Sequence, residues 1–204
     1  MRTPFLPLSM FMAVFTANGQ SWTVLPTATS YDLQDVWSLP QHPDTGVVCG
    51  SYLDGAEILP FAMRTTNGGV TMVPQDVSFG GNFTGAFAMD FVEGNTGYMC
   101  GGGVLATYNG GQGWGQLVDV FEVNGTLYDV DALTTEDVYA VGEAFDATGM
   151  AMVTHDGWNN WATSIISDVN DDENTFMTAV VRATANRLYA GASAGISGMP
   201  TLFL

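Results

Sequence analysis

Thr107-Tyr108-Asn109-Gly110-Gly111-Gln112-Gly113-Trp114 decides the fold, because its skeleton occurs three times along the chain. The other copies are Thr65-Thr66-Asn67-Gly68-Gly69-Val70-Thr71-Met72 and Thr154-His155-Asp156-Gly157-Trp158-Asn159-Asn160-Trp161. The shared part is Thr, any residue, Asn or Asp, and Gly. An Asn or Asp side chain accepts hydrogen bonds from its own loop, and Gly readily adopts a positive φ. Each copy therefore predicts a tight turn between two strands, followed by an apolar anchor, which is Trp114, Trp161, or Met72 where Trp is expected.

A second repeated feature, an apolar strand that ends in glycine, lies upstream of each turn. Its glycines are Gly50, Gly101, Gly142 and Gly191, at intervals of roughly 40 to 50 residues. A short strand and a turn precede each of these strands, and two further strands flank the Asn/Asp-Gly turn that follows. One repeat therefore consists of four antiparallel strands. This length and strand number are typical of one blade of a β-propeller. One such sheet cannot bury both of its faces, so neighbouring blades must stack.

The sequence therefore predicts an all-β protein, a β-propeller with about four blades that form either a compact ring or a fragment of a larger one. The repeats cover approximately residues 31–78, 85–117, 126–164 and 176–204, inside a single domain of residues 20–204. The fourth repeat ends at the position of its third strand, and no fourth strand follows it in the sequence. Gln20-Ser21-Trp22-Thr23-Val24-Leu25 resembles the missing fourth strand, so we expect an N-terminal strand to close the last blade and cover its edge.

Residues 1–19 have the order of regions typical of a signal peptide. Arg2 supplies the positive charge, Phe5 to Phe15 is mostly apolar, and Ala17-Asn18-Gly19 provides small residues before a cleavage site. We therefore expect a secreted protein, extracellular or periplasmic, without a transmembrane segment, since this apolar run is too short to span a bilayer. In the alternative interpretation, the apolar N-terminus is a strand of the closing blade.

The charge is strongly one-sided, with 21 acidic residues against four arginines and a net charge of −17. Such a surface repels phosphate backbones, which argues against nucleic acid as a partner. The excess of acids serves either solubility or the binding of cations. Pairing of Cys49 with Cys100 is one interpretation for an exported protein. They occupy the same position of successive repeats, however, and such positions are usually too far apart for a disulfide, so we expect both to be small buried core residues.

The turn skeleton resembles the Asp-box, or bacterial neuraminidase repeat, whose pattern is Ser/Thr-x-Asp-x-Gly-x-Thr-Trp. The rhythm of the whole chain is similar to the propellers related to the photosystem II stability/assembly factor and to secreted bacterial proteins with that repeat. The resemblance implies that the turns stabilise the outer strands and carry no chemistry. Their residues are Thr65, Asn67, Gly68, Gly69, Thr107, Asn109, Gly110, Gly111, Trp114, Thr154, Asp156, Gly157 and Trp161.

Three groups of residues are candidates for chemistry or binding. A sialidase needs three converging arginines, and Arg64, Arg182 and Arg187 do not occupy equivalent inner positions. Asp90 and Asp131 align near the inner strands of the second and third repeats, where they would line a hydrated channel, act as an acid–base pair or bind a cation. Asp168, Asn170 and Asp172 match the start of a calcium loop. However, Glu173 stands where Gly is expected and Ala179 where a ligand is expected, so a solvated acidic loop is the alternative to calcium.

These observations favour a non-catalytic propeller that binds or scaffolds a protein or a glycan through its loops. A photosystem assembly factor-like protein and a carbohydrate-active hydrolase are the alternatives. The aromatic residues Trp37, Trp158 and Trp161 either form a binding surface or wedge between blades.

Overall fold

The computed structural model describes residues 31–80, 83–166, 175–184, 187–194 and 201–203, and nearly all of its regular structure is β-strand. The first blade contains β1 (Asp32–Ser38), β2 (Gly46–Asp54), β3 (Glu57–Thr65) and β4 (Val73–Pro74). The second contains β6 (Ala86–Val92), β7 (Thr96–Gly101), β8 (Val104–Thr107) and β9 (Gly113–Val118). The third contains β10 (Gly125–Ala132), β11 (Asp137–Ala144), β12 (Gly149–His155) and β13 (Ala162–Ile166), and the fourth contains β14 (Thr175–Thr184), β15 (Arg187–Ala194) and β16 (Thr201–Phe203).

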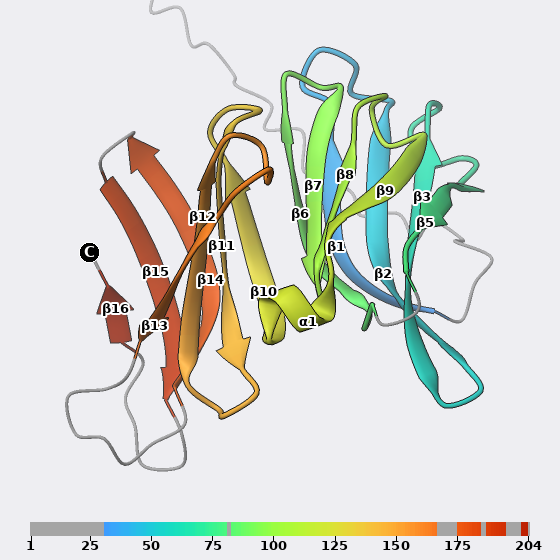
Figure 1. Cartoon of the computed structure of the whole chain (residues 1–204). Helices are drawn as coiled ribbons and strands as arrows, with labels where there is room; N and C mark the ends of the chain where they lie inside the picture. Colours follow the sequence, from blue (N-terminus) through green and yellow to red (C-terminus); the bar gives the residue numbers. More distant parts are fainter. Residues whose placement is uncertain (1–30, 81–82, 167–174, 185–186, 195–200, 204) are drawn as a thin grey trace, which may run out of the picture.

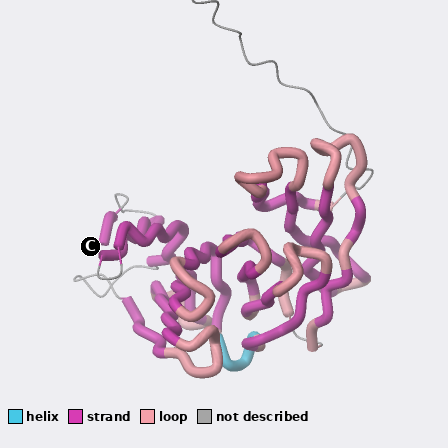
Figure 2. Tube along the Cα trace, turned by 90° about the horizontal axis from the view of Figure 1, so that it is seen from above, coloured by secondary structure: helices cyan, strands magenta, loops and turns pink. Residues whose placement is uncertain are grey.

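The four sheets stand side by side around a common axis, which confirms the predicted β-propeller (Figure 1). Within each blade the strands pair antiparallel in chain order. The first strands β1, β6, β10 and β14 contact one another in succession. Figure 2 shows that the blades follow an open arc whose first and last members lie apart. The described residues thus form part of a ring and not a compact four-bladed ring. The expected closing strand at residues 20–25 lies outside the described residues.

Two elements depart from the simple repeat. β5 (Asp76–Ser78) follows the first blade but pairs in parallel with β9, at the outer edge of the second blade. The four-residue helix α1 (Val120–Val123) connects the second blade to the third. Asp119 caps α1 by accepting hydrogen bonds from the amides of Phe121 and Glu122, and the Glu122 carboxylate bonds back to the Asp119 amide. Asn124 ends the helix in a left-handed conformation with φ of 54°.

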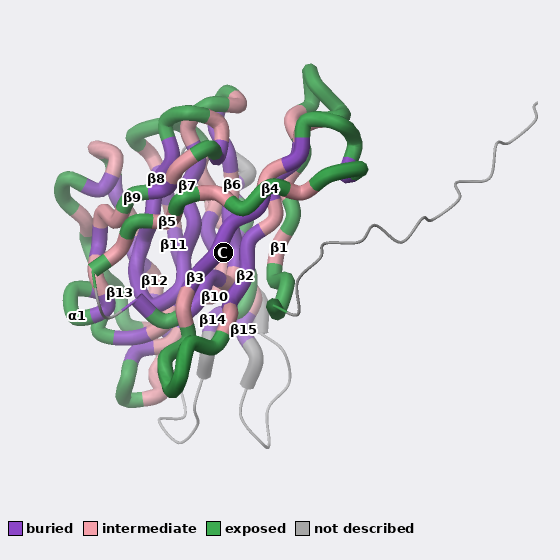
Figure 3. The backbone as a smooth tube through the Cα atoms, turned by 90° about the vertical axis from the view of Figure 1, so that its right-hand side faces the viewer, coloured by how far each residue is buried: buried purple, intermediate pink, exposed green. Residues whose placement is uncertain are grey.

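Apolar side chains from neighbouring blades form one core at each of the three junctions. Figure 3 shows buried residues along the strands and exposed residues in the turns at their ends. Cys49 belongs to the core between the first two blades, and Cys100 to the core between the second and third. Both are free and fully buried, as the sequence predicted, and burial raises the pKa of both thiols.

A β-bulge in each inner strand explains the repeated glycines. Gly50, Gly101 and Gly142 pair with Leu33, Ala86 and Leu127, the residues immediately before the bulge. A Cβ atom at any of the three would lie about 2 Å from a backbone carbonyl oxygen, so only glycine fits. The predicted equivalence of Gly191 was wrong by one residue. In the fourth blade the corresponding position is Ala192, which pairs with Met177, because the register of β15 is shifted relative to the spacing seen in the sequence.

Candidate functional site

The three repeated turns have the same internal hydrogen bonds. In the second turn, Thr107 Oγ1 donates to Asn109 Oδ1 at 2.8 Å and accepts from the amide of Gly111 at 3.0 Å. Asn109 Oδ1 also accepts from the amides of Gln112 and Gly113. Thr65 with Asn67, and Thr154 with Asp156, form the same arrangement. These polar atoms therefore hold the loop backbone itself.

Each turn is also tied to the first hairpin of its own blade. The amides of Gly68, Gly110 and Gly157 donate to the carbonyl groups of Asp44, Asn95 and Glu136 at 2.8 to 3.0 Å. All three glycines have positive φ. In the third turn Trp158 replaces the second glycine and adopts φ of 68° itself, with its side chain buried in the core between blades two and three.

The aromatic residues considered for a binding surface mostly serve packing. Trp37 stacks on Phe91 with ring centroids 4.2 Å apart, across the junction of the first two blades. Trp114 is buried against the edge of Phe91. Trp161 is half-buried against the core between the second and third blades. The wedge interpretation therefore holds for Trp37 and Trp158.

The inner strands carry a row of aspartates that connects the blades. Asp35 Oδ2 accepts a hydrogen bond from the amide of Met89 in the second blade at 2.8 Å, and Asp90 Oδ2 accepts from the amide of Ala132 in the third blade at 2.8 Å. Asp129 and Asp131 accept from the amides of Val180 and Arg182 in the fourth blade at 2.7 and 3.2 Å. We call these four residues, Asp35, Asp90, Asp129 and Asp131, the axial aspartates.

Three of the axial aspartates also bond to their own strands. Oδ1 of Asp35, Asp90 and Asp129 accepts from the amide of the next residue at 2.7 to 2.9 Å. One carboxylate thus satisfies two amides on the inner edges of adjacent sheets. The sequence pointed only to Asp90 and Asp131, and it missed Asp35 and Asp129. The alternation Asp129-x-Asp131 on one strand was the available signal, because both side chains then point to the same face.

Burial dominates the electrostatics of this row. Burial is the main reason that the pKa of Asp90, Asp129 and Asp131 lies above the ordinary value, and hydrogen bonds from backbone amides partly offset it. Neighbouring axial aspartates raise the pKa of Asp90 and Asp129 further. The two carboxyl groups that were candidates for an acid–base pair, Asp90 and Asp131, each accept an amide of a different neighbouring blade.

The other candidate residues do not converge. Arg64 Nε donates to the carbonyl of Gly110 at 2.9 Å, whereas Arg182 lies over the ring of Tyr139, 4.6 Å from its centroid. The calcium candidates Asp168, Asn170 and Asp172 lie outside the described residues. Within the described ranges, no group of three His, Cys, Asp or Glu residues has a geometry suited to a metal ion.

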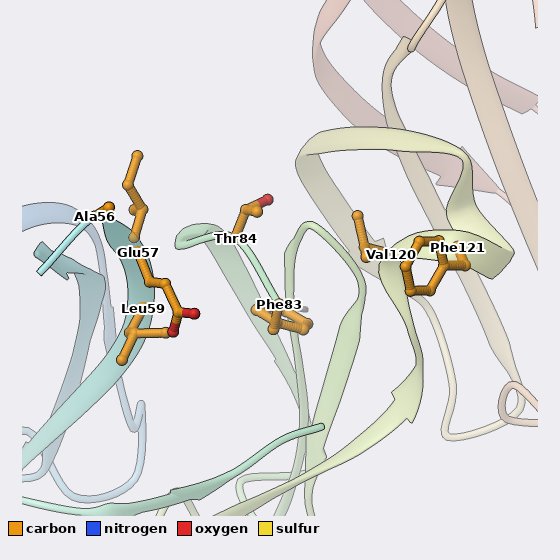
Figure 4. Close-up of a pocket in the computed structure, with 8 residues that line it drawn as sticks. Ala56, Glu57, Leu59, Phe83, Thr84, Val120 and Phe121 are labelled. Carbon is orange, nitrogen blue, oxygen red and sulfur yellow. The ribbon is translucent and has the colours of Figure 1, made fainter. Parts of the chain in front are cut away.

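An apolar pocket of about 400 Å³, which the sequence did not reveal, opens beside α1 (Figure 4). The β2–β3 hairpin forms one wall with Glu57, Ile58 and Leu59, and α1 forms the other with Val120 and Phe121. Phe83 and Thr84 lie between the two walls in Figure 4. The amide of Gly85 donates to the carbonyl of Ile58 at 3.1 Å and so fixes this loop against the hairpin. Sequence patterns could not predict the pocket because its walls come from separate repeats.

Solved structures with the same arrangement include YCF48. YCF48 from Cyanidioschyzon merolae matches with a TM-score of 0.65 at 17% identity, over 91% of this chain and 56% of that one. YCF48 bound to D1 peptide matches with a TM-score of 0.55 at 18% identity, over 87% and 54%. The GH74 xyloglucanase from Xanthomonas campestris matches with a TM-score of 0.55 at 14% identity, over 78% and 26%.

These likenesses bear on the fold alone. The chain is a β-propeller. It spans little more than half the length of the two YCF48 structures. No protein-family model matches the sequence, and no curated protein matches it either. Among the described residues, no helix is long and apolar enough to cross a membrane.

Proposed function

We propose that this chain is a non-catalytic propeller module that binds a protein partner at the end of the blades where α1 lies. The observation that carries the proposal is the apolar pocket together with its exposed rim. Phe121 is 70% exposed and Ile58 is 49% exposed, while Phe83 at the base of the pocket is only 2% exposed. Exposed apolar side chains around a preformed hollow are typical of protein-binding surfaces.

One comparison supports a binding role of this kind. One of the similar structures is YCF48 in complex with a D1 peptide, so this propeller arrangement can hold a peptide. The repeated turns further suggest that the chain is a member of the Asp-box propellers, similar to photosystem assembly factors. A sugar-binding site would require several free polar groups beside an aromatic platform, whereas the walls of this pocket are mainly apolar.

The alternative is a carbohydrate-active hydrolase, because GH74 enzymes share the fold. Hydrolysis needs one carboxyl group as acid and another as base or nucleophile, both facing the substrate. The axial aspartates instead accept hydrogen bonds from backbone amides of adjacent blades. In our proposal they are structural, and the module acts outside the cytoplasm after removal of residues 1–19.

A peptide selection and a hydrolysis assay test the proposal together. We expect immobilised wild-type protein to enrich peptides from a random library displayed on phage, and the variant Phe121→Ser to lose them. Tyr108→Ser is the matched control, because Tyr108 is 65% exposed in the second turn, away from the pocket. The absence of peptides that depend on Phe121 would refute the binding site. Release of reducing sugar from xyloglucan by wild type, abolished in Asp90→Asn, would replace it with the hydrolase.

A further inference from the structure

The surface around the pocket combines exposed apolar side chains with acidic ones. Leu53 and Ile58 on the β2–β3 hairpin, Phe121 on α1 and Phe145 on the β11–β12 hairpin are all at least 49% exposed. The two hairpins and α1 lie at the same end of the blades (Figure 1). The amide of Phe145 donates to the carbonyl of Asn124, the C-cap of α1, at 3.0 Å. We call Leu53, Ile58, Phe121 and Phe145 the apolar strip.

Acidic residues accompany the apolar strip at each step. Asp54 and Glu57 face each other across the β2–β3 hairpin, next to Leu53 and Ile58. Glu122 follows Phe121, and Asp146 follows Phe145. All four acids are exposed in the structure. Glu57 lines the pocket itself, so an apolar side chain that enters the pocket lies beside a carboxylate.

The described arginines lie at the other end of the blades. Arg64 is at the end of β3 farthest from the Asp54–Glu57 turn, and its guanidinium is bonded to Gly110. Arg182 and Arg187 flank the turn between β14 and β15, which corresponds to the turn between β10 and β11, and not to the start of β10 beside α1. The chain has no lysine, so no described cation compensates the acids around the pocket.

We infer that the partner presents a basic peptide segment in which a large apolar side chain is next to Arg or Lys. The apolar side chain fills the pocket between Leu59, Phe83 and Phe121, and its burial supplies the affinity. The neighbouring cation pairs with Glu57, which lines the pocket. This charge complementarity selects the partner and raises its association rate, since the net charge of −17 attracts cations over a long distance. The inference rests on the proposed function and specifies the ligand of that same site.

Synthetic peptides test this inference directly. The probe is a fluorescein-labelled twelve-residue Gly/Ser peptide with a central Arg-Leu-Phe-Arg. One comparison peptide has Glu in place of both Arg, and another has Ser in place of Leu and Phe. We expect fluorescence anisotropy to show at least tenfold weaker binding of both comparison peptides. We also expect the affinity of the basic probe to fall between 50 and 300 mM NaCl.

Variants of the protein locate the bound peptide. Phe121→Ser should weaken the basic probe at least tenfold, and Glu57→Gln should weaken it severalfold while reducing its dependence on salt. Tyr108→Ser and Glu136→Gln, at exposed positions outside the pocket, should leave it unchanged. Thermal melting of each variant verifies that it is folded.

The outcomes separate this inference from the proposed function. If acidic or uncharged apolar peptides bind as tightly as the basic probe in a manner that depends on Phe121, the binding site stands and the preference for a basic partner is refuted. If the basic probe binds equally to wild type and Phe121→Ser, the inference is also refuted, because the contact is then only general attraction to an acidic surface. The library selection described above decides separately whether the pocket binds peptides at all.

Discussion

Oδ2 of Asp129 lies 2.7 Å from the amide nitrogen of Val180 on the inner strand of the next blade. The other oxygen of the same carboxylate accepts the amide of Val130 on its own strand. Inner strands are sheet edges, and their free amides need partners when they are removed from water. Asp35 has the same two bonds at the junction of the first and second blades. Two carboxylates thus satisfy the equivalent amides of all four inner strands.

Removal of the Asp129 carboxylate should therefore destabilise the protein. Asp129→Ala leaves the amides of Val130 and Val180 without their acceptors, and we expect a loss of about 1–3 kcal/mol in the free energy of unfolding. Urea denaturation measures this loss. Asp76→Ala, which removes the same charge at an exposed position of β5, is the control and should change stability by less than about 0.5 kcal/mol. Equal effects of the two variants would show that the bond between the blades contributes nothing.

We also expect the stability of the protein to depend on pH through the axial aspartates. Asp90 has a higher pKa in the folded protein than the ordinary value. Between the unfolded and folded pKa values the native state binds more protons, so the contribution of Asp90 to stability is present at low pH and decreases as pH rises through this window. We expect the stability advantage of wild type over Asp90→Asn to shrink from pH 4 to pH 7. Unfolding curves at several pH values measure it, and an advantage that grows with pH would contradict the expectation.

Gly142, which lies at a bulge, and Gly191, which does not occupy the equivalent position, offer a direct comparison. A Cβ at Gly142 would lie 1.9 Å from the carbonyl oxygen of Thr126, whereas a Cβ at Gly191 would meet only the Cβ of Ala179 at 3.8 Å. We expect Gly142→Ala to reduce stability by at least about 2 kcal/mol, because the strand must shift. Gly191→Ala should change it by less than about 0.5 kcal/mol. Thermal or urea unfolding distinguishes the two, and a similar loss in both would refute the register described for the fourth blade.

The hydroxyl of Thr154 is the centre of the third turn. It accepts from the amides of Asp156 and Trp158 and lies 2.7 Å from the carbonyl oxygen of Asn160. Thr154→Val keeps the shape of the side chain and removes these bonds, so we expect a loss of about 1–3 kcal/mol in stability. Thr163→Val, at an exposed position of β13, should be close to neutral. Unchanged stability in Thr154→Val would mean that the turn does not depend on its hydroxyl.

Local chemistry made much of this fold predictable. The turn at Thr107 to Gly111 depends only on residues close in sequence, and its repetition was enough to predict stacked four-stranded blades. The hydrogen bond between Asp35 and Met89 joins two blades, and the two walls of the pocket, Phe121 and the β2–β3 hairpin, come from different repeats. Such contacts depend on how far one blade rotates against the next, and spacing along the chain does not encode that rotation. The misplaced Gly191 has the same origin, since a one-residue shift within a bulge is invisible in a pattern of apolar residues.

The open arc also has a consequence for the order of unfolding. The second and third blades are stacked on both faces, whereas the first and fourth blades of the described arc have one stacked neighbour each. In a linear array of this kind, the free energy of local unfolding is lower for the end blades than for the middle ones, because the end blades have fewer stacking interfaces. Amide hydrogens of β15 should thus exchange with solvent through local fraying, while those of β7 and β11 should exchange only when the whole array opens.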